Sequence, residues 1–163
     1  MFSIFSQSYQ SYLDYINSHY PNAIAYLSGN RNNPNIDGRI EFYQTCDGVL
    51  VLTQVKNLPQ NETGNFFAMH IHSGDSCELT DGEFVNTPHL NLTNKNHPSH
   101  TGDLPVILSN DGSAFSLNLT NRFTINDIID KTIVIHENAD DYRLDPSGNS
   151  GTKIACGKIL KRC

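Results

Sequence analysis

The amino-acid sequence predicts an all-β domain, an antiparallel sandwich or barrel of about eight strands. Two observations predict this fold. Short segments of alternating apolar and polar residues, or of β-branched residues, follow one another along the chain, and turn-forming residues separate them. Helix signals are few. The segments that we expect to be strands are 23–27, 39–43, 49–55, 66–72, 104–108, 115–119, 132–136 and 154–160.

The four strands expected in the first half of the chain differ in pattern. Residues 23–27 are a short apolar run, whereas apolar and polar side chains alternate over 39–43. Residues 49–55 are rich in β-branched and aliphatic side chains, which are common in strands. The fourth segment, 66–72, follows a turn-rich stretch and ends in a histidine.

The strands expected in the second half include one clear hairpin. Apolar residues alternate over 104–108 and again over 115–119, and the Asn-Asp-Gly sequence at 110–112 between them is typical of a tight β-turn. Residues 132–136 are β-branched almost throughout, and 154–160 form the last strand.

Two long segments between these strands are polar and irregular. Residues 73–102 and 137–153 are rich in glycine, aspartate, asparagine, proline and serine. Each begins directly after a histidine that ends an expected strand. Because long loops inside a β domain are uncommon and usually functional, we expect both to contribute to a site.

The first 20 residues have a different pattern. Apolar side chains recur there at helical spacing, and Pro21 ends the run. We therefore expect an N-terminal extension over 1–20, either a short helix packed on the barrel or a mobile tail, followed by a single domain over 21–163. The apolar residues at helical spacing are Phe2, Phe5, Tyr9, Leu13 and Ile16.

Composition excludes several classes of protein. The chain has 163 residues, of which 37% are hydrophobic, enough for one domain with a full core. No apolar run approaches the roughly 18 residues of a membrane helix. The net charge is −6 and no basic stripe is present, so we expect no nucleic-acid partner and no membrane association. The N-terminus is a poor secretory signal, which favours a cytoplasmic location.

The histidines form an informative pattern. His70 and His72 lie two residues apart on an expected strand, so their side chains point to the same face. Such a pair alone is weak evidence, because it more often lies on a surface. His136 ends a buried β run, where a polar side chain needs a partner. Of the seven histidines, only His19 lies outside the strand ends and the first long loop.

The first loop adds a second group of candidate ligands. His97, His100 and Asp103 follow one another at intervals of three residues. Two imidazoles and a carboxylate suit a tetrahedral zinc site that needs one more ligand, and His89 lies eight residues upstream. The alternative, that these are ordinary surface or core histidines, does not explain why they gather at strand ends and in one loop.

The segments around these residues resemble the Cu,Zn superoxide dismutase family. The order of the motifs and most of their spacings agree over about residues 23–160. The segments that carry the resemblance are His-Ile-His at 70–72, Pro-His-Leu-Asn at 88–91, the histidines at 97 and 100, Gly-Asp-Leu at 102–104, Val-Ile-His-Glu-Asn-Ala-Asp-Asp at 134–141, Gly-Asn-Ser-Gly at 148–151 and Ala-Cys-Gly at 155–157.

The resemblance implies an eight-stranded Greek-key barrel that converts superoxide to dioxygen and hydrogen peroxide. It also implies two cofactors, a copper ion that cycles between redox states and a zinc ion with a structural role. The implied copper ligands are His70, His72, His89 and His136. The implied zinc ligands are His89, His97, His100 and Asp103, so His89 would bridge both metals and return a proton to the departing peroxide.

Three further residue roles follow from the resemblance. Asp140 matches a carboxylate that hydrogen-bonds one histidine of each metal, here His70 and His97. Lys153 occupies the position of a family arginine beside the copper, where it would guide the substrate anion as part of the catalytic site. Lysine keeps the charge of arginine but lacks its planar fork of donors.

The cysteines require the resemblance for their assignment. By themselves, four cysteines allow three complete pairings, and an intracellular chain keeps thiols reduced by default. Cys77 and Cys156 match the intrasubunit disulfide of the family, which leaves Cys46 and Cys163 free.

The resemblance also makes predictions about partners. We expect a homodimer, because the family's contact lies near the disulfide and Ile128-Ile129 resembles another part of it. Thr152 and Ile154 stand where prolines flank the cation in family members that need a copper chaperone, so we expect no obligatory chaperone. The main alternative function is a dismutase-like protein that binds copper and zinc without turnover, and a purely structural β-sandwich is a third.

Overall fold

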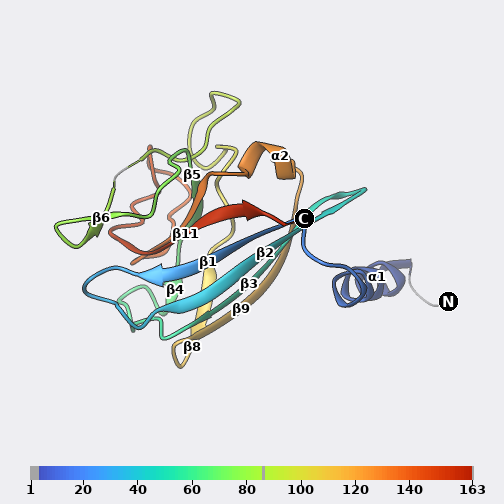
Figure 1. Cartoon of the computed structure of the whole chain (residues 1–163), viewed down its shortest axis with the longest axis horizontal. Coiled ribbons are helices and arrows are strands. Elements are labelled where there is room, and N and C mark those ends of the chain that lie inside the picture. Colours follow the sequence, from blue (N-terminus) through green and yellow to red (C-terminus); the bar gives the residue numbers. More distant parts are fainter. Residues whose placement is uncertain (1–3, 86, 163) are drawn as a thin grey trace.

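In the computed structural model, which describes residues 4–85 and 87–162 and the side chains from residue 11 on, a nine-stranded antiparallel sheet forms the body of the molecule (Figure 1). The strand order in this sheet is β4-β8-β9-β3-β2-β1-β11-β10-β5. The strands are β1 (Ala23–Gly29), β2 (Asp37–Thr45), β3 (Gly48–Lys56), β4 (Phe66–Phe67), β5 (Met69–His72), β8 (Ile107–Asn110), β9 (Ser113–Thr120), β10 (Thr132–His136) and β11 (Lys153–Lys161).

The two ends of this strand order belong to one continuous segment. Strands β4 and β5 are separated only by Ala68, yet β4 pairs with β8 and β5 pairs with β10. The sheet therefore nearly closes into a barrel. Connections from β3 to β4 and from β9 to β10 pass between strands that are not neighbours, as in a Greek key. The all-β antiparallel prediction is confirmed, with the segment 66–72 divided into two strands because it switches partners at Ala68.

The barrel interior is filled by alternate side chains of these strands. Ile40 and Phe42 of β2 and Val49 and Val51 of β3 are all inaccessible to solvent. Each fully buried side chain of this kind contributes about 1.5–3 kcal/mol relative to its exposed state. On β5, Ile71 lies between His70 and His72 and packs in the same core. The core therefore fixes which face of β5 carries the two histidines.

The predicted strand at 104–108 is wrong at its beginning. Strand β8 begins only at Ile107. Pro105 has no N–H to donate to a ladder, and the N–H of Val106 donates to the hydroxyl of Tyr142 instead. Leu104 is nonetheless buried in the core, which explains its place in the apolar pattern.

Three short elements were not predicted. Strands β6 (Leu79–Thr80) and β7 (Glu83–Phe84) form a hairpin within the first long segment, and α2 (Ile125–Ile128) precedes β10. Two-residue strands and a single helical turn are too short to produce a periodic pattern. The hairpin packs beside the disulfide through Phe84, which contacts Cys156.

The N-terminal segment is helical over α1 (Ile4–Ser18). Tyr12, Tyr15 and Ile16 pack on the outer face of β2 and β3, against Tyr43 and Leu50. Figure 1 shows α1 and the β6–β7 hairpin at opposite ends of the molecule. Of the apolar residues expected on the helix, Phe2 lies outside the described residues, and Phe5 and Tyr9 lie outside the described side chains. The division into an extension and a domain at residue 20 stays a prediction.

None of the helices in the described part of the chain is both long and apolar enough to cross a membrane.

Candidate metal centre

Three of the four expected copper ligands are placed by two neighbouring strands. His70 and His72 come from β5, and His136 ends β10, which pairs with β5 so that Val134 lies opposite His70. The ladder between β10 and β11 contains a bulge between Ile135 and His136. Bulges of this kind re-aim side chains near functional sites.

Backbone hydrogen bonds to β5 bring the loop residues to the same place. The N–H of Leu90 donates to the carbonyl of Ile71 at 2.8 Å, and the N–H of Ile71 donates to the carbonyl of Gly102 at 2.9 Å. His89 and Asp103 are thereby held beside the strand histidines. A Cβ at Gly102 would collide with the carbonyl of Ile71, so glycine is required for this close approach.

The side chains gather in two clusters that share His89. In each cluster one potential ligand atom per residue lies within 4.8 Å of the others, and all members are buried. The first cluster is His70, His72, His89 and His136. The second cluster is His89, His97, His100 and Asp103. The expected ligand sets are therefore the groups that the fold brings together.

Hydrogen bonds at the rear of the first cluster fix which nitrogen faces inward. Nδ1 of His72 donates to the carbonyl of Thr87 at 2.6 Å, and Nδ1 of His136 donates to the carbonyl of Gly151 at 3.2 Å. In neutral imidazoles both Nε2 atoms are then acceptors, yet they lie 3.1 Å apart. Two lone pairs at this distance repel each other unless a cation lies between them.

Other ring nitrogens are buried without any hydrogen-bond partner among the described residues. They are Nδ1 of His70, Nε2 of His89 and Nδ1 of His97. A buried polar atom of this kind costs about 1–3 kcal/mol, so a native structure needs a reason for it. Coordination of a metal ion by the bare nitrogen supplies that reason, and the residues present therefore fit copper and zinc.

Burial keeps three histidines of the first cluster, His70, His72 and His136, neutral. Desolvation lowers the pKa of His136 to about 3, and also lowers the pKa values of His70 and His72. A neutral imidazole offers the lone pair that binds a metal. These histidines are thus in the metal-binding form at neutral pH.

The second cluster surrounds a carboxylate with three imidazoles. The Nδ1 atoms of His89, His97 and His100 lie 2.8, 3.2 and 3.3 Å from the carboxylate oxygens of Asp103. Burial alone would raise the pKa of Asp103, but a hydrogen bond from His89 lowers it below its usual value. Three nitrogens and one carboxylate oxygen match the donor set of a tetrahedral zinc site.

Asp140 connects the two clusters. Its carboxylate accepts hydrogen bonds from Nε2 of His70 at 2.7 Å and from Nε2 of His97 at 2.8 Å. Burial would raise the pKa of Asp140, but the bonds from His70, Tyr142 and His97 lower it to about 2. Such a carboxylate fixes the tautomer of each ring and leaves Nδ1 for a metal. Gly148 allows this packing, since a Cβ there would overlap the carboxylate.

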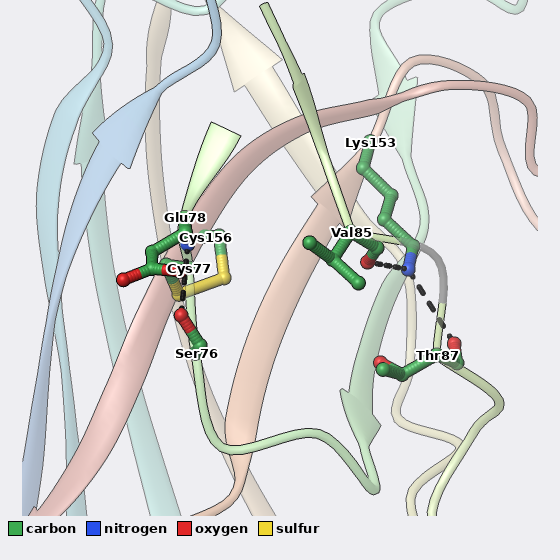
Figure 2. The surroundings of a disulfide bond; sticks show 7 residues. All are labelled: Ser76, Cys77, Glu78, Val85, Thr87, Lys153 and Cys156. Atoms are coloured by element: carbon green, nitrogen blue, oxygen red, sulfur yellow. Dashed lines mark hydrogen bonds between the residues drawn. A yellow bond between two sulfur atoms is a disulfide. The ribbon is translucent and has the colours of Figure 1, made fainter. Parts of the chain in front are cut away.

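Lys153 lies in the wall of the cavity that opens onto the first cluster. The cavity has a volume of about 470 Å³, and His72, His89 and His136 also line it. The Lys153 ammonium donates to the carbonyls of Val85 at 3.0 Å and Thr87 at 3.4 Å (Figure 2). Burial lowers its pKa to about 8. Lys153 is therefore buried in the cavity wall and held by two carbonyls, unlike an exposed surface lysine.

The expected disulfide is present. Cys77 and Cys156 are bonded, with their Cα atoms 5.7 Å apart, and Figure 2 shows the bond between the first long loop and β11. Phe84 and Val134 pack around it. Cys46 is free and exposed, and Cys163 lies outside the described residues.

Several groups that shape the site were not predicted. Asn30 is buried, and its amide donates to the carbonyl of Lys153 at 3.1 Å and to Glu83 at 3.4 Å. The carbonyls of Thr87 and Gly151 orient two histidines, but a backbone group carries no signal in a sequence. The Asn30 contacts join residues more than 50 positions apart, so no local pattern could reveal them.

Comparisons with known proteins agree with this arrangement. The family model described as copper/zinc superoxide dismutase matches residues 36–159. Superoxide dismutase [Cu-Zn] 1 of Aquifex aeolicus is 33% identical over 137 residues, which are 75% of this chain and 79% of that protein. Superoxide dismutase [Cu-Zn] of Legionella pneumophila is 31% identical and covers 75% of this chain and 76% of its own length.

A solved structure extends the agreement to three dimensions. A double mutant of a SOD-like protein from Bacillus subtilis matches with a TM-score of 0.70 and 29% identity, over 88% of this chain and 99% of that one. The fold and the paired histidine clusters define a β-barrel protein with two adjacent metal sites. The chain belongs to the copper/zinc superoxide dismutase family. It is accordingly an oxidoreductase with copper and zinc as cofactors.

Proposed function

We propose that this chain converts two superoxide anions and two protons to dioxygen and hydrogen peroxide. Copper would be held by His70, His72, His89 and His136, and zinc by His89, His97, His100 and Asp103. The observation that carries the proposal is the set of buried ring nitrogens that have no hydrogen-bond partner among the described residues or that face one another. When bound, copper supplies a one-electron change between Cu(II) and Cu(I), and zinc supplies a fixed charge without redox chemistry.

His89 is the residue that we assign to proton transfer. Its Nδ1 lies 2.8 Å from Asp103 on the zinc side, and its Nε2, the atom on the side of the first cluster, has no hydrogen-bond partner in the described part of the chain. When it does not hold copper, Nε2 would be able to accept a proton and later donate it to the peroxide product. Because Asp103 and the backbone bonds of Leu90 hold the ring in place, the proton is delivered from a fixed position.

The experiment that tests the function combines metal analysis with a direct assay of superoxide decay. Purified protein loaded with copper and zinc should contain one of each per chain and should consume superoxide catalytically. A protein that holds both metals and does not accelerate superoxide decay would be the dismutase-like binding protein without turnover. A protein that binds neither metal would be a structural module.

Lys153 is proposed to guide superoxide to the copper side. The chain carries a net charge of −6, so an anionic substrate needs a local positive charge at the cavity. We expect Lys153→Gln to lower the second-order rate constant by about tenfold at low salt, without a change in metal content. The loss should shrink as salt screens the field over about 10 Å at 0.1 M.

Two controls separate charge from packing at Lys153. Lys153→Arg keeps the charge and should be at least as active as the parent protein, since guanidinium adds donors. Lys158→Gln removes the same charge from a half-buried residue that pairs with Asp130, and should leave the rate unchanged. An unaltered rate for Lys153→Gln at low ionic strength would show that another group attracts the anion.

A homodimer is also part of the proposal, but one expected contact is wrong. Ile128 is fully buried in the barrel core and Ile129 packs against that core, so Ile128 cannot serve as a contact with a partner. Large apolar side chains are exposed elsewhere on the barrel, namely Tyr26, Leu108 and Phe115. Sedimentation equilibrium of the metal-loaded protein tests the oligomeric state, and a monomer at micromolar concentration contradicts it.

Chaperone independence and a cytoplasmic location stay predictions. The residues on either side of Lys153 are Thr152 and Ile154, neither of them proline, and Ile154 is buried in the core. Expression with copper in a host that lacks the copper chaperone should give active enzyme. Cell fractionation tests the location.

A further inference from the structure

One arginine contacts the zinc loop from outside the metal centre. Arg122 lies between the end of β9 and the beginning of α2, and its Nη1 donates to three carbonyls. The acceptors are the carbonyl oxygens of Pro98 at 2.8 Å, His100 at 3.2 Å and Asp103 at 3.4 Å. Two of these three residues are members of the second histidine cluster.

The contacted segment is a tight turn that already holds itself together at its ligands. The N–H of His100 donates to the Asp103 carboxylate at 2.9 Å, and the N–H of Asp103 donates to the carbonyl of His100 at 3.3 Å. On the other side of the loop, the N–H of His97 donates to the Asp145 carboxylate at 2.7 Å. Arg122 thus fixes the end of the turn that Asp145 does not reach.

We propose that Arg122 is a positioning residue for zinc: it fixes the turn that presents His100 and Asp103, and so slows the release of the metal. The inference rests on the proposed assignment of His89, His97, His100 and Asp103 to zinc. Arg122 contacts backbone carbonyls and not the ring nitrogens or carboxylate oxygens that would bind zinc. It therefore acts through the backbone of His100 and Asp103, whose side chains would bind zinc.

Geometry and not charge should govern the effect. A cation near a zinc site opposes zinc binding, so a purely electrostatic role for Arg122 would weaken the site. However, Arg122 is exposed, and water and salt screen its charge. A planar guanidinium holds several acceptors in a fixed arrangement, whereas a lysine ammonium would rotate freely. The same exposure lets water replace the lost hydrogen bonds, which limits the cost in overall stability.

The expected loss of zinc affinity can be judged from other residues that orient metal ligands. Removal of a group that holds a ligand in place typically weakens metal binding by 10–100-fold. Because Arg122 contacts the backbone and not the ligating rings, we expect Arg122→Gln to lie near the lower limit, about tenfold weaker in zinc affinity. Copper retention should not change, since none of the three carbonyls belongs to His70, His72 or His136.

The test uses the full-length protein loaded with both metals. Zinc release to a chromogenic chelator is measured for the parent chain, Arg122→Gln and Arg122→Lys, with Arg39→Gln as a control. Arg39 is an exposed arginine on β2, so this control changes the net charge equally. Zinc should leave Arg122→Gln about tenfold faster, and Arg122→Lys should lie between it and the parent. The control should match the parent.

A second readout distinguishes positioning from a general loss of stability. Cobalt(II) replaces zinc in the same protein, and its visible absorption bands report the ligand geometry. The bands should shift in Arg122→Gln and stay unchanged in Arg39→Gln, while the metal-free variants melt at the same temperature. Unchanged zinc release and cobalt bands overturn the proposal, and so does slower release, which would reveal an electrostatic role.

The outcomes also separate this proposal from the proposed function. If the parent protein holds zinc but does not consume superoxide, the catalytic proposal fails and the effect of Arg122 is still measured. If the parent protein binds no zinc, the zinc assignment fails and the role of Arg122 fails with it.

Discussion

Replacing His136 with alanine is expected to remove copper and abolish dismutase activity while zinc stays bound. Nε2 of His136 lies 3.1 Å from Nε2 of His72 in the first cluster, and His136 has no place in the second. The loss of a direct ligand should exceed the 10–100-fold that follows when a supporting residue is removed. Metal content per chain and the rate of superoxide decay are the measurements.

Zinc retention serves as the internal control for this variant. Loss of the buried ring also leaves the carbonyl of Gly151 without its donor, at a cost of about 1–3 kcal/mol in the free energy of unfolding. A variant that still holds one zinc per chain has kept the second cluster and therefore the fold. His19→Ala changes an exposed histidine outside both clusters and should keep both metals. Wild-type activity in His136→Ala would disprove the copper assignment.

The strand histidines could be predicted because their geometry is local. Residues two apart on a strand share a face, and Ile71 between them is fully buried, so His70 and His72 had only one direction available. The core fixes this register, since a shift by one residue would place two imidazoles in the apolar interior. The same reasoning identified most of the strands, whose patterns extend over five or more residues.

The contacts of Asp140 could not be derived from a local pattern. They join it to His70, 70 positions away, and to His97, 43 positions away. Only the resemblance to a known family assigned this role in the sequence. The three carbonyls that accept from Arg122 had no signal either, because backbone groups are the same at every position.

Lys153 and Ile128 show what burial adds to an interpretation made from sequence. Only the resemblance placed Lys153 beside the copper, and the structure shows that its ammonium reaches two carbonyls of the neighbouring segment. Two successive isoleucines read as a surface contact, but Ile128 completes the core beneath α2. In both cases the deciding neighbours come from other elements of the fold.

Removing the disulfide is expected to destabilise the protein by about 4.5 kcal/mol. Cys77 and Cys156 are 79 positions apart, and the chain-entropy model gives this value for a closed loop of that length. For a domain of this size it corresponds to a fall of roughly 9–18 °C in melting temperature. The double variant Cys77→Ala with Cys156→Ala should show it in thermal unfolding of the metal-free protein, where bound metal adds no stability of its own.

The disulfide should also affect the copper side more than the zinc side. It ties the loop that contains the β6–β7 hairpin to β11, three residues from Lys153, whose ammonium binds the carbonyls of Val85 and Thr87 (Figure 2). Relative to the parent protein, the release of copper from the double variant should therefore be accelerated more than the release of zinc. Cys46→Ala removes an exposed thiol and is the matched control, with no change in melting temperature. Reduction of the parent protein should reproduce the effect without any change of side-chain volume. If the double variant melted at the same temperature as the parent, the disulfide would not stabilise the protein by restricting the unfolded chain.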